Sequence, residues 1–569
     1  MADDLTLVIR GGLVVDGTGA APVEADIGIA GDRIVTVGRI ASRGVEEIDA
    51  RGQIVTPGFV DPHTHYDAQV MWANHITPSS CNGVTTALIG NCGVGFAPCK
   101  PDQRDMLVEL MEGVEDIPEP VLTQGLPWNW ESFPDYLNRI AERRFDIDVA
   151  AQVPHAALRV FVMGERGVAR EPATEADRQA MARLAAEGIR AGALGFSTSR
   201  TLNHKTLDGR PTPTLHAAEE ELATIAKAVG EVGSGWLQVI SDFDEAIESE
   251  FAMFRRLVEI SGRPMTTTIL ERDSKPREWR RLLDLIGQAN ADGLPITGMV
   301  LTRPTGIMLG FEISQNPFVD LPSWDAIADL PFDAKIAALR DPDLKARLLA
   351  EVPRDPALAK RLRRWDRIFP LGDPPDYEPP PERSIAAEAA RLGVDPAALA
   401  YDKMLENNGR AILYRPLSNY ANGTLETVRE MMAHPNTLIG LGDGGAHVSI
   451  LCDATAMTYG LTHWTRDRAS GRFPLEWMVR RLTQDNAKAL GLTDRGVIAA
   501  GRKADINVID YDHLNLRAPK VIYDLPAGGR RLMQTSDGFT ATVLSGQIVS
   551  RNGQATGALP GRLLRGTPS

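Results

Sequence analysis

The 569-residue chain has few cysteines and no excess of positive charge. Four cysteines are too few for a disulfide framework in a protein of this length, which favours a reducing compartment. The 61 Lys and Arg against 75 Asp and Glu give a net charge of −14, so no basic surface is expected to attract nucleic acid or an anionic membrane. With 43% hydrophobic and 24% charged residues, the composition is that of a globular protein rather than a disordered chain or a coiled coil.

Long apolar runs are also missing. No stretch approaches the roughly 18 uninterrupted apolar residues of a membrane-spanning helix. The first ten residues, Met-Ala-Asp-Asp-Leu-Thr-Leu-Val-Ile-Arg, contain no basic region followed by an apolar run, so we expect no signal peptide. We therefore expect a cytoplasmic protein that binds neither membrane nor nucleic acid. The sequence leaves its oligomeric state open, and a homo-oligomer is compatible with it.

Short runs of β-type residues occupy both ends of the chain. They lie within residues 5–57 and again from about 504 to 549, separated by Gly and Asp turns, with no helical period between them. Residues 1–57 and 500–569 are therefore predicted to form the two parts of one small β-sandwich. Two independent β-caps remain the alternative.

The central region, residues 58–499, alternates apolar runs with helical patterns. Thr174 and Asp177 form a capping-box pattern before a predicted helix over 175–190. Eight βα units predict an α/β fold of the (β/α)8 TIM-barrel type, whose active site lies at the carboxyl ends of its strands. A mostly helical insertion is predicted over about 305–415. The eight candidate strands are Ile54–Val60, Thr85–Gly90, Ile147–Val153, Ala193–Ser197, Trp236–Ser241, Met265–Leu270, Ile296–Thr302 and Leu438–Asp443.

Two histidines follow the first of these barrel strands. In Asp61-Pro62-His63-Thr64-His65 the imidazoles are two residues apart, and on an extended chain such residues point the same way. Neutral imidazole is the commonest protein ligand for zinc and similar metals. A His-X-His pair alone is weak evidence, but at the end of a barrel strand it indicates a metal site.

Two further strand ends carry candidate ligands. Cys92 lies in the Gly-rich turn Gly90-Asn91-Cys92-Gly93, where it fits either a zinc thiolate or a small buried residue. Asp443 follows the last strand, where a carboxylate can both bind a metal and accept a proton as general base. An Asp-Gly pair is also ordinary turn chemistry, but beside His63 and His65 we favour the functional interpretation.

Taken together, these motifs resemble the amidohydrolase superfamily and, within it, the N-acyl-D-amino-acid deacylase (D-aminoacylase) branch. The resemblance implies a metal-bearing barrel with a β-sandwich built from both termini that hydrolyses amide or related C–N bonds. It also implies that His63 and His65 are metal ligands, that Cys92 is the ligand typical of the deacylase branch, and that Asp443 is both ligand and general base. It rests on residues 58–65, 83–86, 90–93, 154–155, 158–159, 195–199, 442–444, 483–487 and 496–510.

The chain departs from that family pattern in its metal ligands. The family usually places one His at the end of the fifth strand and another at the end of the sixth, but no His lies between 216 and 434 here. We therefore expect one zinc ion rather than two, held by His63, His65 and Asp443 with Cys92, although another divalent metal remains possible. Asp242 and Glu271 lie near the two strand ends, and we favour salt-bridged surface carboxylates over substitute ligands there.

A second departure concerns the substrate. The cations that hold a substrate carboxylate in the deacylase branch are missing or displaced, since the segments read 269–272 Ile-Leu-Glu-Arg and 446–452 Ala-His-Val-Ser-Ile-Leu-Cys. Binding a carboxylate without a charged partner is costly. A larger or less charged small-molecule amide therefore fits better than an N-acyl-D-amino acid. Candidate substrate-binding residues are His155, His204 and His447, of which His155 fits a structural role equally well.

Two alternative functions remain open. A cyclic-amide or carbamoyl hydrolase on the same barrel usually carries a carboxylated Lys at the metal, but no Lys lies at any of the eight strand ends. A metal-poor barrel that only binds ligands would explain the missing histidines, but not the retention of His63, His65 and Asp443. Metal-assisted amide hydrolysis, with Asp443 as the base, is the function that we expect.

Overall fold

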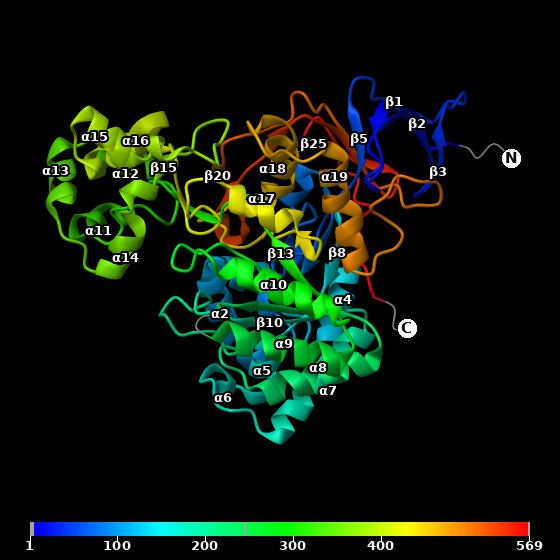
Figure 1. Ribbon diagram of the computed structural model, residues 1–569. Helices are drawn as coiled ribbons and strands as arrows, with labels where there is room; N and C mark the ends of the chain where they lie inside the picture. Colours follow the sequence, from blue (N-terminus) through cyan, green and yellow to red (C-terminus); the bar gives the residue numbers. More distant parts are fainter. Residues whose placement is uncertain (1–4, 244–245, 567–569) are drawn as a thin grey trace.

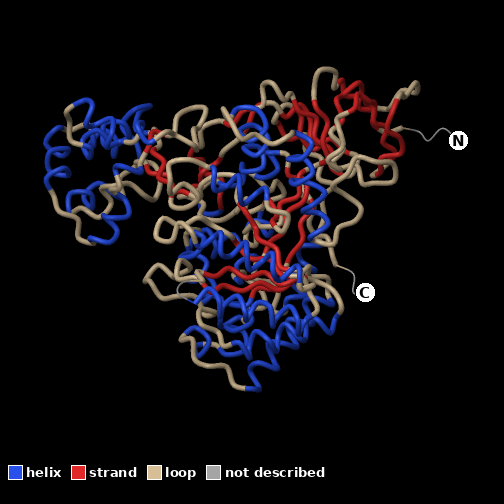
Figure 2. Tube along the Cα trace, viewed as in Figure 1, coloured by secondary structure: helices blue, strands red, loops and turns tan. Residues whose placement is uncertain are grey.

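The computed structural model describes residues 5–243 and 246–566 of the chain. A barrel of parallel strands and helices occupies its centre and lower part, and a large sheet lies at the upper right (Figure 1). A mainly helical lobe projects to the left (Figures 1 and 2). No helix among the described residues is long and apolar enough to cross a bilayer.

The large sheet combines nine strands from the two ends of the chain. Its centre is the antiparallel pair of β5 and β18, in which Val55 faces Val508. Ile9, Ile27 and Val543 belong to the same buried core. Apolar residues from the N-terminal and C-terminal parts of the sequence are therefore buried together. The strands are β1 (Leu7–Val14), β2 (Val23–Ala30), β3 (Arg33–Gly38), β4 (Glu46–Asp49), β5 (Ile54–Pro57), β18 (Ile506–Ile509), β23 (Phe539–Leu544), β24 (Gln547–Arg551) and β25 (Gln554–Ala555).

The barrel strands pair in parallel in two groups. Sheet β6-β7-β8 and sheet β17-β13-β12-β11-β10-β9 meet where Gln152 alone separates β8 from β9. At the other junction the Asn486 side-chain amide donates to the carbonyls of Val60 on β6 and Ile439 on β17, both at 2.8 Å. The strands are β6 (Phe59–Asp61), β7 (Val84–Ile89), β8 (Asp148–Ala151), β9 (Val153–Pro154), β10 (Gly195–Arg200), β11 (Trp236–Ser241), β12 (Met265–Thr268), β13 (Ile296–Val300) and β17 (Thr437–Ile439).

Amphipathic helices alternate with these strands. Helix α7 begins with the capping box that the sequence predicts, since Thr174 and Asp177 each accept a backbone hydrogen bond from the other residue. Helix α8 buries Leu222, Ile225 and Val229, which follow the helical period. The helices that follow barrel strands include α5 (His155–Met163), α7 (Glu175–Arg190), α8 (Glu219–Val232), α9 (Ile247–Ser261), α10 (Glu278–Ala291) and α17 (Glu426–Ala433).

The expected strand Ile54–Val60 is two strands in the structure. Residues 54–57 form β5 in the terminal sheet, and residues 59–61 form β6 in the barrel. Gly58 separates them, and a Cβ atom there would lie 2.2 Å from Thr85 Oγ1. The absence of a side chain at Gly58 therefore allows the chain to pass closely between the two sheets.

The lobe formed by the insertion has a core of its own. Leu309, Phe311, Tyr401 and Leu413 are buried together in it, and the three-stranded sheet β14-β16-β15 lies at its base. The sheet strands are β14 (Gly306–Leu309), β15 (Phe369–Pro370) and β16 (Leu413–Pro416). The helices are α11 (Pro322–Ala328), α12 (Phe332–Leu339), α13 (Pro342–Ala350), α14 (Pro356–Leu362), α15 (Ile385–Leu392) and α16 (Pro396–Gly409).

Candidate metal centre at the barrel mouth

The two histidines after β6 are buried beside each other. The Asp61 carboxylate accepts a hydrogen bond from the His63 backbone N–H at 3.1 Å, and the His65 N–H donates to the Gly444 carbonyl at 2.7 Å. The imidazole ring centroids are 5.3 Å apart. Burial lowers the pKa of His63 well below its usual value, which leaves that ring in the neutral form that binds metals.

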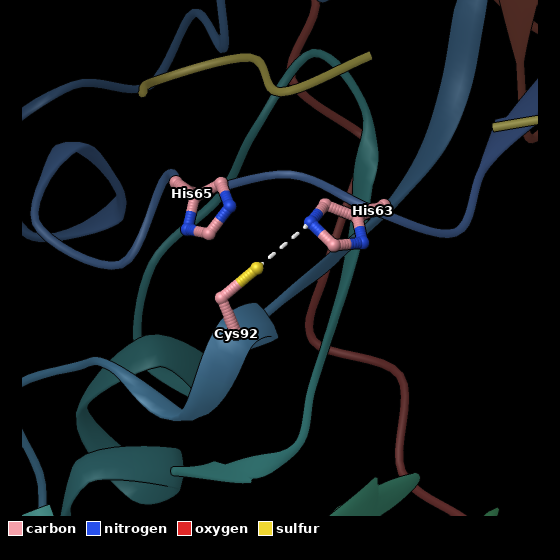
Figure 3. Close-up of side chains that lie close together, drawn as sticks. All are labelled: His63, His65 and Cys92. Atoms are coloured by element: carbon pink, nitrogen blue, oxygen red, sulfur yellow. Dashed lines mark hydrogen bonds between the residues drawn. The ribbon is translucent and has the colours of Figure 1, made fainter. Parts of the chain in front are cut away.

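Cys92 lies in a short turn after β7 with left-handed backbone geometry. Its φ of 55° is uncommon for a residue with a side chain, and Gln238 on β11 holds it by accepting the Cys92 N–H at 2.8 Å. The thiol points toward both imidazoles (Figure 3) and lies 3.3 Å from His63 Nε2. Metal-ligating atoms of Cys92, His63 and His65 all lie within 4.8 Å of one another.

Asp443 completes this group from the loop after β17. The strand ends at Ile439, earlier than expected, because Leu441 and Asp443 have φ of 60° and 44°. Asp443 Oδ1 lies 3.3 Å from His63 Nε2 and 3.8 Å from His65 Nε2. Non-glycine residues in the left-handed region are strained, and such strain is concentrated at functional sites.

Glu115, at the end of α2 (Arg104–Glu115), is a member of the site that the sequence analysis missed. Its Oε1 lies 3.0 Å from His65 Nδ1, and both side chains are buried. Burial alone lowers the pKa of a histidine, but the carboxylate raises the pKa of His65 well above its usual value. The same contact outweighs the effect of burial on Glu115 and lowers its pKa to about 2. A carboxylate on the far nitrogen of a ligating histidine fixes its orientation.

The donor atoms of this cluster fit a divalent cation. Two imidazoles, a thiol and a carboxylate are the ligand types that zinc prefers. Asp443 Oδ1, Glu115 Oε2 and His63 Nδ1 are buried and make no hydrogen bond. Burial raises the pKa of Asp443 well above its usual value, so the ionised carboxylate is costly without a cation beside it. A metal ion beside Asp443 Oδ1 would relieve that cost.

His204 and His447 are brought to the same part of the mouth. The loop after β10 carries His204, whose Nδ1 is 2.9 Å from Ser199 Oγ, and burial lowers its pKa to about 4. Burial also lowers the pKa of His447, and the charges of both rings act on Glu115. Both rings are thus close enough to act on the Glu115 carboxylate, and their role toward a substrate stays a prediction.

His155 has a different environment. It is fully buried, with Nδ1 2.8 Å from Thr198 Oγ1 and Nε2 2.7 Å from Glu221 Oε1. Arg159 pairs with the other Glu221 oxygen. Both ring nitrogens of His155 are thus engaged by protein side chains, and the structure favours the structural role that the sequence left open.

The carboxylates near the ends of β11 and β12 are engaged in loop contacts. Asp242 accepts hydrogen bonds from Thr201 Oγ1 at 2.6 Å and from the Leu202 N–H at 2.7 Å. Glu271 is fully buried, rather than at the surface as expected, and accepts from Thr427 Oγ1 at 2.9 Å and from the Ala421 N–H at 3.0 Å. Both groups hold loops in place, so neither supplies the ligands missing from the fifth and sixth strands.

A family model described as the amidohydrolase family matches residues 46–550. The chain belongs to this family. D-aminoacylase of Alcaligenes xylosoxydans is 25% identical over 99% of this chain and 98% of its own length. N-acyl-D-aspartate deacylase of the same organism is 26% identical over 98% of this chain and 94% of its own length.

A solved amidohydrolase structure agrees with the fold. N-acyl-D-glutamate deacylase of Bordetella bronchiseptica, in complex with zinc and a phosphonate inhibitor, superimposes with a TM-score of 0.65. It is 23% identical, with 99% of this chain and 100% of that chain covered. The predicted TIM-barrel fold and the predicted membership of the amidohydrolase family are confirmed. The roles of the individual site residues and the number of metal ions stay predictions.

Proposed function

We propose that this amidohydrolase hydrolyses the N-acyl amide bond of a small molecule with one zinc ion held by His63, His65, Asp443 and Cys92. The observation that carries the proposal is the convergence of these four donors, with Asp443 Oδ1 and Cys92 Sγ each 3.3 Å from His63 Nε2. The absence of histidine from β11 and β12 supports one ion over two. A zinc ion supplies Lewis acidity that lowers the pKa of water and polarises an amide carbonyl.

The protein side chains supply the proton transfers in this proposal. Asp443 accepts the proton of the attacking water at a carboxylate oxygen and returns it to the amide nitrogen as the C–N bond breaks. Oδ1 is the oxygen that faces the two imidazoles, so the second carboxylate oxygen of Asp443 is the one left for the proton. Glu115 keeps His65 oriented through Nδ1, so that Nε2 is presented to the metal.

The substrate meets His204 and His447 at the barrel mouth. His447 lies four residues after Asp443 and has a φ of 46°. The strained loop that carries the base therefore also carries this ring. We propose that both histidines form hydrogen bonds to the amide substrate. The acidic composition and the few cysteines support a cytoplasmic enzyme with a small-molecule substrate and no nucleic-acid or membrane partner.

Metal analysis of the purified enzyme, combined with a substrate screen, tests the proposal. We expect about one zinc ion per chain, loss of activity on chelation, and recovery when zinc is restored. The screen compares N-acyl amino acids, simple amides and dipeptides at a defined zinc concentration. A protein without bound metal that gains no amidase activity from added zinc would instead be a ligand-binding barrel.

A further inference from the structure

Ile240, near the end of β11, faces the inside of the barrel. Trp236 on the same strand belongs to a buried cluster that draws one residue from each of five other barrel strands, Val60, Leu88, Ala150, Met299 and Leu438. A cluster with members from strands on every side fills the barrel interior. Gln238 points the same way, because its Oε1 accepts the Cys92 N–H at 2.8 Å. Side chains alternate between the two faces of a strand, so Ile240 shares the inner face with Trp236 and Gln238.

Ser199 and Thr268 flank Ile240 on the neighbouring strands. Ser199 on β10 pairs with Ile240 in the parallel ladder. Thr268 on β12 lies two residues after Thr266, which is the ladder partner of Gln238. Parallel partners point to the same face of a sheet, so Ser199, Ile240 and Thr268 form one inward row near the carboxyl ends of three strands. We call these three side chains the mouth row.

The mouth row borders the turn that carries Cys92. Gly93 packs so closely on β10 that a Cβ atom there would lie 3.0 Å from the Ser199 backbone nitrogen. Ser197, the inward residue before Ser199, holds the same turn, because its Oγ accepts the Gly93 N–H at 3.0 Å. Ser199 Oγ in turn lies 2.9 Å from His204 Nδ1. The mouth row is therefore in contact with the metal centre on the side of β10 and β11.

Solvent in the barrel mouth reaches the mouth row. Ile240 is half-buried, whereas Trp236 and Gln238 before it on the inner face are buried. Thr268 is 8% exposed, against 1% for Thr266. On β11 and β12 the mouth row is thus the innermost part of the wall that a substrate can contact.

No side chain of the mouth row is charged. Its members are one aliphatic group and two hydroxyls. The arginines that follow on β10 and after β12 are already paired, Arg200 with Glu250 and Arg272 with Glu278. A charged group of the substrate would lose its water here without gaining a partner, whereas an apolar group gains from burial against Ile240.

The position of Asp443 decides which half of an amide reaches the mouth row. Asp443 follows β17, the eighth barrel strand, and three strands separate β17 from β10 in the sheet. In a closed barrel of eight strands, the eighth therefore lies opposite the fourth, which is β10. Because Asp443 returns a proton to the amide nitrogen, the amine half lies on its side of the mouth. The acyl half then points across the mouth toward β10, β11 and β12.

We propose that Ile240, flanked by Ser199 and Thr268, is the specificity-determining wall of an acyl subsite that takes an uncharged, aliphatic acyl group. Ile240 and Thr268 face inward near the ends of the fifth and sixth strands, where this chain has no histidine. At these strand ends the chain thus presents a surface to the substrate rather than ligands to a second metal. This inference rests on the proposed function, because it names the acyl half of that substrate.

Paired amides test the subsite on the zinc-loaded full-length enzyme. The substrates are N-benzyl-4-methylpentanamide and N-benzylacetamide, and the acyl preference is the ratio of their kcat/KM values. I240A removes three carbon atoms from the wall, so it should lower this preference by about 10- to 100-fold. Ile240 is half-buried, and thermal unfolding should show an intact fold. An unchanged preference in the folded variant would overturn the proposal.

Val239 provides the matched control, because it precedes Ile240 on β11 and faces the other side of the sheet. V239A should lose stability, since Val239 is buried, but it should keep the wild-type acyl preference. An equal fall in V239A would assign the effect to strand packing. N-methylacetamide and N-benzylacetamide vary the amine instead, and I240A should leave their ratio unchanged. A change in that ratio, with the acyl preference intact, would place Ile240 at the amine and refute the acyl subsite.

Binding measurements separate this proposal from the proposed function. In calorimetry, zinc-loaded D443N protein should bind N-benzyl-4-methylpentanamide about 10- to 100-fold more tightly than D443N/I240A protein, and D443N/V239A should match D443N. This difference supports the subsite even if the wild-type enzyme hydrolyses neither amide, a result that would count against the proposed function alone. Equal affinities of D443N and D443N/I240A would overturn the subsite, whatever the wild-type enzyme hydrolyses.

Discussion

Two buried histidine–glutamate pairs of the described barrel residues differ in how the polar atoms of the two side chains are partnered. His155 and Glu221 form a closed group, because both ring nitrogens and both carboxylate oxygens have protein partners. His65 and Glu115 form an open group, in which Glu115 Oε2 and the neighbouring Asp443 Oδ1 make no hydrogen bond.

The difference between the two groups indicates that the closed group stabilises the fold and that the open group is available to bind a ligand. In the closed group the carboxylate compensates buried positive charge, and the pairing stabilises the fold. In the open group the same residue types leave donors and acceptors free, which costs free energy unless a ligand binds. The function of a buried histidine that follows a barrel strand therefore depends on which of its polar neighbours are already hydrogen-bonded.

The substitution D443N should have the largest effect on the open group. Without the carboxylate, kcat should fall by at least about 1,000-fold, because the substitution removes a base and a metal ligand together. Thermal unfolding should show an intact fold, since burial already disfavours the charge of this carboxyl group. A variant that retains more than a tenth of the wild-type kcat would rule out Asp443 as the base.

E221Q should break the closed group and cost stability instead. His155 and Arg159 outweigh the effect of burial and lower the pKa of Glu221 from 4.5 to about 2. A lowered pKa contributes stability above pH 4.5 that is lost as the pH falls toward 2, and a shift of this size corresponds to about 3 kcal/mol. Urea unfolding should show that loss at pH 7 and a much smaller one at pH 3. The zinc content of E221Q should stay at the wild-type level. A lower zinc content would show that the closed group also supports metal binding, which would contradict the difference between the two groups.

E115Q should have the smallest of the three effects. It tests whether the Glu115 carboxylate of the open group supports zinc binding. Loss of the carboxylate beside His65 Nδ1 should weaken zinc binding by about 10- to 100-fold, measured by competition with a chelator. E112Q is the control, because Glu112 lies one turn earlier on α2 and its Oε1 accepts the Glu119 N–H at 3.0 Å. Equal zinc affinities in the two variants would show that Glu115 has no role in orienting His65.

The sequence predicted the barrel because its signal is local. Apolar runs of strand length alternate with helical periods, and the polar residues His63, His65 and Asp443 follow strand ends directly. Positions on different strand ends converge in any closed parallel barrel, so their proximity follows from the fold class. The capping box at Thr174 was visible for the same reason, since its two residues are three apart.

The sequence could not indicate Glu115. This residue ends a helix in the long connection between β7 and β8, so it does not follow a barrel strand directly. Glu115 also has no unusual spacing, because a carboxylate at a helix end is most often solvated. Only the packing of α2 against the mouth gives it a buried partner in His65.

The sequence by itself determined the alternation of strands and helices, the histidine pair after the first barrel strand and the aspartate after the last. The tertiary structure decided which buried groups are paired and which are free: His155 is satisfied by Glu221, whereas Asp443 Oδ1 is left without a hydrogen bond. The reason is physical. Strand and helix patterns depend on near neighbours along the chain, whereas a polar group finds its partner among residues that only folding brings within about 3 Å.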